Sequence, residues 1–198
     1  MLKNGMFYIL LFSIYLLLPF FIFINVISFD FKFYALTIGG VLVFLLMKWY
    51  GCKNEDMGIS QKNIVLSIKN TQALTGILFL SGILLFIFGK GQRFNINEDG
   101  SFFLFYIFIS CPIQEFLYRG SLNAVFNNLK FSSIKTIFIS SLLYSYAHII
   151  YCDFPTLLLT FSIGIIRHYL YRKTNNLCGV ILSHIVLGIV TILIGLIN

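Results

Sequence analysis

Long apolar runs dominate the sequence, and short polar segments separate them. A run of about 18 or more apolar residues is long enough to cross a bilayer as a helix. Seven runs of this kind lie at 6–28, 33–50, 71–89, 101–127, 133–152, 155–172 and 177–197. The pattern therefore predicts an all-α fold, a polytopic transmembrane helix bundle of about seven spans.

Basic residues gather in alternate connections between these spans. If the N-terminus is cytoplasmic, the cytoplasmic side carries Lys3, Lys48, Lys53, Lys62, Lys69, Lys130, Lys135, Arg172 and Lys173, and the other side carries Lys32, Lys90 and Arg93. The positive-inside rule therefore predicts a cytoplasmic N-terminus and an external C-terminus. The polar segment 51–70 becomes the long cytoplasmic loop, with a short amphipathic helix over residues 63–69 lying along the membrane interface.

Composition agrees with a membrane protein and argues against a nucleic-acid-binding protein. Hydrophobic residues make up 59% of the chain, charged residues make up 11%, and the mean hydropathy is +0.92, whereas about a quarter of the residues of soluble domains are charged. The net charge of +7 comes from basic residues placed singly at span ends, which argues against nucleic acid as a partner and for the lipid bilayer. The four cysteines form no CxxC pair, so neither a zinc knuckle nor a disulfide framework is expected. The abundance of Phe, Ile, Tyr, Asn and Lys favours an AT-rich genome and hence a bacterial plasma membrane.

A few ionisable residues lie well inside the predicted spans, where a charge costs on the order of 3 kcal/mol or more. They are Glu115, Arg119, His148, Arg167, His168 and His184. Arg167 and His168 are within six residues of the cytoplasmic end of their span, and we interpret them as side chains that reach the lipid headgroups. The other four are candidates for a functional site.

The stretch CPIQEFLYRG, residues 111–120, holds two of these candidates. Glu115 and Arg119 are spaced i, i+4, so they share a helix face and can form an ion pair. Such a pair can also be purely structural. Gln114 lies about 100° around the helix from Glu115, and Pro112 removes a backbone hydrogen bond. We therefore expect a locally kinked helix whose freed backbone groups contact protein or water.

Two histidines on other spans extend this polar set. His148 ends YSYAH in the fifth span, and His184 lies in LSHIVLG in the seventh. Together with Glu115 they fit water activation for peptide hydrolysis, either by the carboxylate itself or through a zinc ion held by all three. No HExxH motif supports zinc, so we expect no cofactor. A transporter or proton relay would share these residues, but the spans show no internal repeat.

The second half of the chain resembles a known family. Residues from about 101 to 197 are similar to the CPBP family of CAAX-protease and bacteriocin-processing proteins, also called Abi. QEFLYRG at 114–120 matches the family motif EExxxR, and YSYAH matches FxxxH with Tyr144 in place of Phe. His184 begins a match to HxxxN in which Gly188 stands where Asn is expected. All three motifs occur in the family order.

The resemblance implies an intramembrane endopeptidase that cleaves near the end of a membrane-associated protein or peptide substrate. It also implies a structural Glu115–Arg119 pair, a catalytic His148, and a His184 that positions water or stabilises the oxyanion. Gln114 falls where the family has its catalytic Glu, and an amide cannot take a proton from water. Either Glu115 serves as the base, or the protein binds a membrane partner or provides bacteriocin immunity without cleavage.

These observations give one predicted organisation. Residues 1–100 form three N-terminal membrane spans, and residues 101–198 form the CPBP-like core that carries the polar site. The predicted catalytic set is Glu115, His148, His184, Arg119 and Gln114, without a metal.

Overall fold

The computed structural model describes residues 2–88 and 100–193, and within them the predicted all-α fold is confirmed. The helices are α1 (Leu2–Phe23), α2 (Lys32–Tyr50), α3 (Ile64–Phe88), α4 (Gly100–Phe105), α5 (Cys111–Glu115), α6 (Leu122–Asn128), α7 (Ser133–Ala147), α8 (Phe154–Arg172) and α9 (Cys178–Leu193). Two π-helical segments, Tyr106–Ser110 and Phe116–Ser121, join α4, α5 and α6 into one continuous helix. Short 3₁₀ turns lie at Phe29–Phe31, Glu55–Met57 and His148–Tyr151.

The helical segments coincide with the predicted apolar runs. Four of them are long and apolar enough to cross a membrane, namely Gly5–Phe23, Phe29–Tyr50, Ile64–Phe88 and Gly100–Asn128, and Cys178–Leu193 is apolar but shorter. The chain is therefore a multi-pass membrane protein. α7 and α8 are less apolar because their buried faces carry Ser and Thr side chains, at Thr136, Ser140, Ser141 and Ser145 and at Thr156 and Thr160.

One predicted boundary is wrong. α3 begins at Ile64 rather than at residue 71, so residues 64–69 are its first turns and not a separate interfacial helix. The reason is a set of polar contacts that hold these turns against the start of α9. Ser67 Oγ donates to the Asn176 carbonyl at 2.9 Å and accepts from the Gly179 N–H at 3.0 Å.

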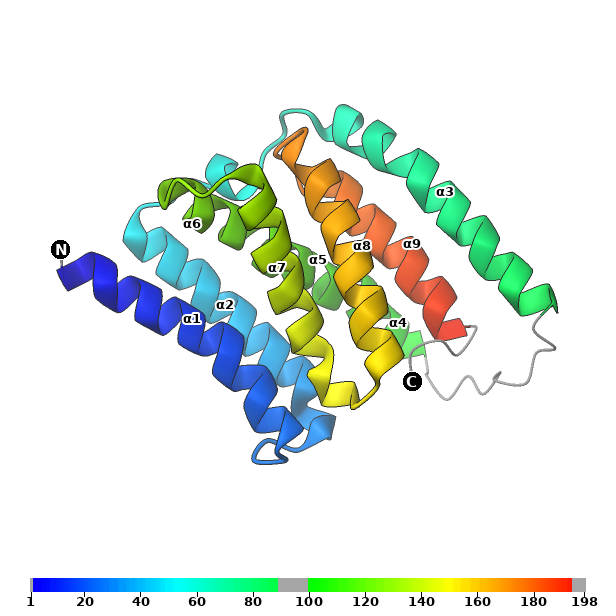
Figure 1. The fold of residues 1–198 in the computed structure, drawn as a ribbon, viewed down its shortest axis with the longest axis horizontal. Coiled ribbons are helices and arrows are strands. Elements are labelled where there is room, and N and C mark those ends of the chain that lie inside the picture. The colour runs from blue at the N-terminus through cyan, green and yellow to red at the C-terminus, as the bar shows by residue number, and fades with distance from the viewer. Residues whose placement is uncertain (1, 89–99, 194–198) are drawn as a thin grey trace.

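Figure 1 shows α1 and α2 side by side on one flank of the bundle and α3 on the opposite flank against α9. α7 and α8 pack together between these flanks, and α4 and α5 lie behind α8 and α9 in this view. The tight contact of α7 with α8 depends on Gly164, because a Cβ atom there would lie 3.1 Å from Ser141 Cβ. Small residues allow this close approach of membrane helices.

The turns at the upper end of Figure 1 are tied to one another. The Asn176 amide donates to the carbonyls of Ser60 and Lys62, each at 2.7 Å. Arg172, at the end of α8, donates to Ser133 at the start of α7 at 3.2 Å. The segments predicted to be cytoplasmic therefore meet at one end of the molecule.

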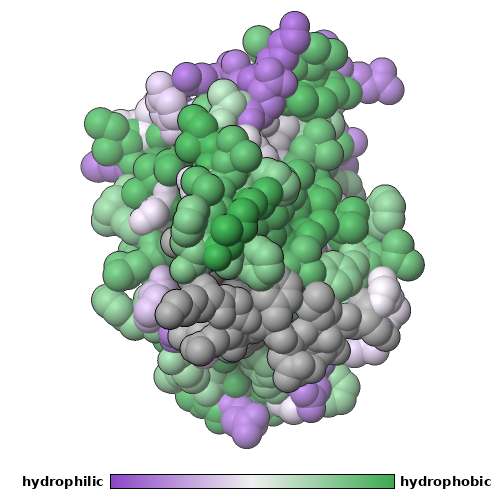
Figure 2. Space-filling model, turned by 90° about the vertical axis from the view of Figure 1, so that its right-hand side faces the viewer, coloured by the Kyte–Doolittle hydropathy of each residue, from purple (hydrophilic) through white to green (hydrophobic). Residues whose placement is uncertain are grey.

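Figure 2, which views the α3 side, shows a broad apolar band with polar side chains at its ends. Many large apolar side chains of α3 are exposed, among them Ile77, Leu80, Leu84 and Ile87. An exposed apolar face of this size fits contact with lipid.

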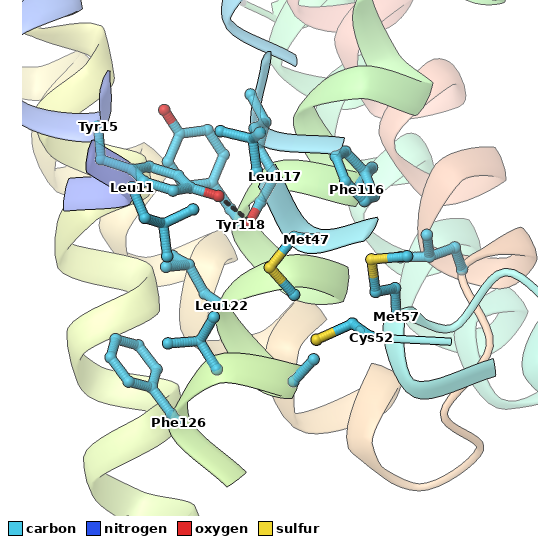
Figure 3. Close-up of a cluster of buried hydrophobic side chains, with 14 of the residues drawn as sticks. Leu11, Tyr15, Met47, Cys52, Met57, Phe116, Leu117, Tyr118, Leu122 and Phe126 are labelled. Carbon is cyan, nitrogen blue, oxygen red and sulfur yellow. Dashed lines mark hydrogen bonds between the residues drawn. The ribbon is translucent and has the colours of Figure 1, made fainter. Parts of the chain in front are cut away.

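A buried apolar cluster anchors the helix 100–128 to the N-terminal helices (Figure 3). Leu11 and Tyr15 of α1 and Met47 of α2 pack against Leu117 and Leu122. The Tyr15 hydroxyl donates to the Leu117 carbonyl at 2.7 Å and lies 2.6 Å from Ser121 Oγ. This contact fixes the π-helical segment Phe116–Ser121, which carries Arg119.

Candidate functional site

Glu115 is the centre of the polar cluster and is fully buried. His184 Nδ1 of α9 lies 2.7 Å from its Oε1 atom, and Arg167 Nη1 of α8 lies 3.4 Å from the same atom. Arg119 Nε lies 3.2 Å from Oε2, so the predicted i, i+4 ion pair is confirmed. Three segments that are distant in the sequence therefore meet at one carboxylate.

The local backbone explains how Glu115 and Arg119 reach this position. Pro112 has no N–H and cannot donate within the helix, and π-helical turns lie directly before and after α5. A π-helical turn rotates the following side chains relative to a regular α-helix, and such turns are frequent at functional sites. The irregularity expected at Pro112 takes the form of these π-helical turns, and the second of them carries Arg119.

The interpretation of Arg167 and His168 as headgroup contacts is wrong. Their exposed fractions are 3% and 1%, and Arg167 points to Glu115 rather than to the membrane surface. The reason is that the buried face of α8, which includes Thr156, Thr160 and Gly164, continues through both residues. This spacing of small residues by four was the sequence signal that could have placed them inside.

Tyr144 of α7 forms the aromatic wall of the cluster. Arg119 Cζ lies 4.2 Å from its ring centroid, a cation–π contact. The imidazole centroids of His148 and His184 lie 4.8 and 6.2 Å from the same ring, both nearly perpendicular to it. The structure thus brings both predicted histidines to one tyrosine but only His184 to the carboxylate.

The hydrogen bonds of the two histidines fix their tautomers. A carboxylate and a carbonyl can only accept, so His184 Nδ1–H donates to Glu115, and His148 Nδ1–H donates to the Tyr144 carbonyl at 2.8 Å. In both neutral rings the Nε2 atom is then the proton acceptor. A base held by a carboxylate through its other nitrogen is an arrangement suited to proton transfer.

Gln114 does not take part in these contacts. Its amide Nε2 donates to Ser110 Oγ, one turn earlier, at 2.9 Å, and the side chain is half-buried. Among the contacts described for the chain, this hydrogen bond is the one that Gln114 makes with another side chain.

Gly188 lies against Tyr106, a residue that no sequence motif indicated. A Cβ atom at Gly188 would clash with the hydroxyl of Tyr106, so that tyrosine occupies the space of a side chain at position 188. The Tyr106 ring is also nearly perpendicular to the ring of His184, with centroids 6.1 Å apart. Only the folded structure shows this, because the two residues are far apart in the sequence.

Several buried polar atoms of the cluster have no hydrogen-bond partner among the described residues. They are Glu115 Oε2, both Nη atoms of Arg119, Arg167 Nε and both ring nitrogens of His168. Oε2 is close enough to Arg119 for an ion pair but lacks the alignment of a hydrogen bond. The described residues contain no group of three His, Cys, Asp or Glu side chains arranged to hold a metal ion.

Comparison with known proteins identifies the segment that contains this cluster. Residues 97–190 match the family model for type II CAAX prenyl endopeptidases, described as Rce1-like. No curated protein and no solved structure matches the chain. The matched segment includes Glu115, Arg119, His148, Arg167 and His184, the polar residues described above. Residues 97–190 are therefore similar to type II CAAX prenyl endopeptidases, which agrees with the resemblance of this part of the chain to the CPBP family.

Proposed function

We propose that the protein is an active intramembrane endopeptidase of the CAAX-protease type, in the plasma membrane of a bacterium. It hydrolyses a peptide bond of a membrane-associated protein or peptide. The observation that carries the proposal is the buried 2.7 Å contact of Glu115 with His184, because it holds an imidazole with one free acceptor nitrogen in an apolar bundle.

In this proposal His184 Nε2 takes a proton from a water molecule whose oxygen attacks the scissile carbonyl carbon. The carboxylate of Glu115 stabilises the imidazolium that forms, as a base-orienting group does in other hydrolases. The tetrahedral intermediate then loses its C–N bond, and the imidazolium returns the proton to the leaving amine. His148 Nε2 is a second acceptor beside Tyr144, and Arg119 holds Glu115 in the charged form through their ion pair.

The test is cleavage of a membrane-anchored peptide by purified protein in liposomes. Glu115→Gln removes the carboxylate that orients the base, and His184→Gln removes the base itself, so each should lower kcat by about a hundredfold or more. Glu55→Gln is the matched control, since Glu55 is an exposed carboxylate paired with Lys62 in the polar loop. Equal turnover by all four proteins would overturn the proposal.

We propose that the reaction needs no metal ion. Turnover should survive dialysis against a strong chelator. Loss of activity that zinc restores would instead assign Glu115, His148 and His184 as ligands of a catalytic zinc.

A second candidate is a protease-like protein that binds a membrane partner or a bacteriocin without cleaving it. Gln114 favours it, because an amide bonded to Ser110 stands at the position of the family's catalytic acid. Gln114→Glu separates the two functions. If only the Gln114→Glu variant cleaves the peptide, the wild-type protein is a binding protein. If the wild-type protein and the variant cleave at similar rates, the wild-type protein is an enzyme.

A further inference from the structure

We propose that the Tyr106 hydroxyl donates a hydrogen bond to the oxyanion that forms from the scissile carbonyl group. This inference rests on the proposed function and adds a catalytic residue to it. It follows from the position of the tyrosine beside His184 and Gly188, and from the kind of donor that the proposed reaction needs.

The Tyr106 side chain reaches α9 at the proposed base. Its ring lies nearly perpendicular to the imidazole of His184, with the two centroids 6.1 Å apart. Its hydroxyl lies at Gly188, one turn farther along α9, in the space that a Cβ atom would need. His184 and Gly188 both belong to the buried face of α9. The hydroxyl is therefore held on the face of α9 that carries the base.

The Tyr106 ring is fixed by its neighbours. Phe102, one turn earlier on the same helix, stacks on it with centroids 6.0 Å apart. Tyr106 also begins the π-helical segment that precedes α5, and π-helical turns are frequent at functional sites. The stacking and the contact with His184 restrict the ring, so the hydroxyl has a defined position before any substrate arrives. Donors that are positioned in advance are the ones that stabilise a transition state most.

The proposed reaction needs a donor on the side of His184 that is remote from Glu115. The Nδ1 atom of His184 bonds Glu115, and Nε2, which takes the proton from water, points away from that carboxylate. Arg119 and Arg167 both contact Glu115, so they lie at the Nδ1 side. As the water oxygen attacks, the π electrons of the C=O bond move onto the carbonyl oxygen, whose negative charge an O–H donor stabilises. The phenol keeps its proton throughout this step.

The resting contacts of the hydroxyl leave it able to make this bond. It interacts with the thiol of Cys111, and a thiol sulfur is a weak acceptor. A hydrogen bond to an oxyanion is about twice as strong as one between neutral groups, so the exchange of sulfur for the oxyanion is favourable. The hydroxyl also interacts electrostatically with Tyr144 and Arg167, which places it at the edge of the polar cluster.

Tyr106→Phe tests the inference, because it removes the hydroxyl and keeps the ring. The oxyanion forms only as the carbonyl reacts, so kcat for the membrane-anchored peptide should fall by about a hundredfold while KM stays nearly unchanged. Tyr171→Phe is the matched control, since Tyr171 is also buried and its hydroxyl bonds Asn175. That control should keep the wild-type kcat. An unchanged kcat in Tyr106→Phe would overturn the inference and leave the proposed function intact.

Two further variants separate donation to the substrate from packing. Cys111→Ala removes the thiol that the hydroxyl meets in the resting protein, and kcat should stay close to the wild-type value. An equal loss in Cys111→Ala and Tyr106→Phe would overturn the inference, because the hydroxyl would then act only through this contact. Tyr106→Ala combined with Gly188→Asn places an amide N–H donor in the vacated volume. Its kcat should exceed that of Tyr106→Ala alone.

The absence of any gain in this double variant, with thermal unfolding showing that it is folded, would contradict a donor at this position. Absence of cleavage by the wild-type protein is a different result. It would overturn the proposed function and this inference together.

Discussion

At the scale of single residues, Gly188 and Tyr106 act as one unit. Gly188 lies one helical turn after His184, and the Tyr106 hydroxyl fills the volume beside it. The identity of residue 188 therefore depends on residue 106. A side chain at 188 requires that the tyrosine ring move, and this ring also contacts His184.

Gly188→Asn tests this dependence. We expect it to lower the free energy of unfolding by about 1–3 kcal/mol, the usual cost of overpacking a filled interior. The double variant Gly188→Asn with Tyr106→Ala should recover part of the loss, because the ring no longer occupies the space. Thermal unfolding in detergent measures both. An unchanged melting temperature in the single variant would contradict the contact.

The residues of the site were predictable to different degrees. The i, i+4 spacing was enough for the Glu115–Arg119 pair, because both partners lie on one helix. For Glu115 and His184 we expected only that their spans meet. A single sequence does not give the tilt of a helix or its depth in the membrane, so the contact itself was not predictable. Arg167 was misplaced because its position near a span end suggested the headgroups, whereas its side chain is buried beside Glu115.

At the scale of elements, α3 depends on α9 for its polar contacts. Thr71 Oγ1 donates to the Gly179 carbonyl at 3.1 Å, and Thr75 Oγ1 donates to Ser183 Oγ at 2.9 Å. Most of the remaining surface of α3 is exposed. These hydroxyl contacts and the close approach at Gly179 therefore decide where α3 docks beside the helix that carries His184.

Gly179→Ala should weaken this docking. Its Cβ atom would clash with the backbone carbonyl of Ser67, and the expected loss is about 1–3 kcal/mol in the free energy of unfolding.

Gly76→Ala on α3 is the control, because a Cβ atom there meets nothing within 4 Å. It should be neutral or stabilise the helix by about 0.5–1 kcal/mol. Thermal unfolding of the two variants should shift in opposite directions, and an equal shift would argue against the tight contact.

At the scale of the whole molecule, the order of helices and connecting segments follows from the apolar runs. Each predicted run corresponds to a helical segment, because a buried backbone in lipid must satisfy its own hydrogen bonds. The register of the helices against one another was not predictable, since it depends on side-chain contacts such as Arg172 with Ser133. Which end faces the cytoplasm remains a prediction from the basic residues.

Cysteine labelling in intact cells tests the orientation. Cys152 is exposed at the end opposite the long polar loop, and Cys52 and Cys111 are buried. With Cys178→Ser as the background, a membrane-impermeant maleimide should label Cys152 from outside.

A cysteine that replaces the exposed Lys62, in the same background with Cys152→Ser, should react only after permeabilisation. The reverse pattern would invert the predicted topology.

The hydrogen bond from Tyr15 to the Leu117 carbonyl has a consequence for protein engineering. The helix 100–128 is held by a hydroxyl that comes from a segment outside the family match. A chimaera that joins the matched segment, residues 97–190, to foreign N-terminal helices would leave this buried carbonyl without its donor. A donor at the equivalent of position 15 is therefore the first feature that such a graft must preserve.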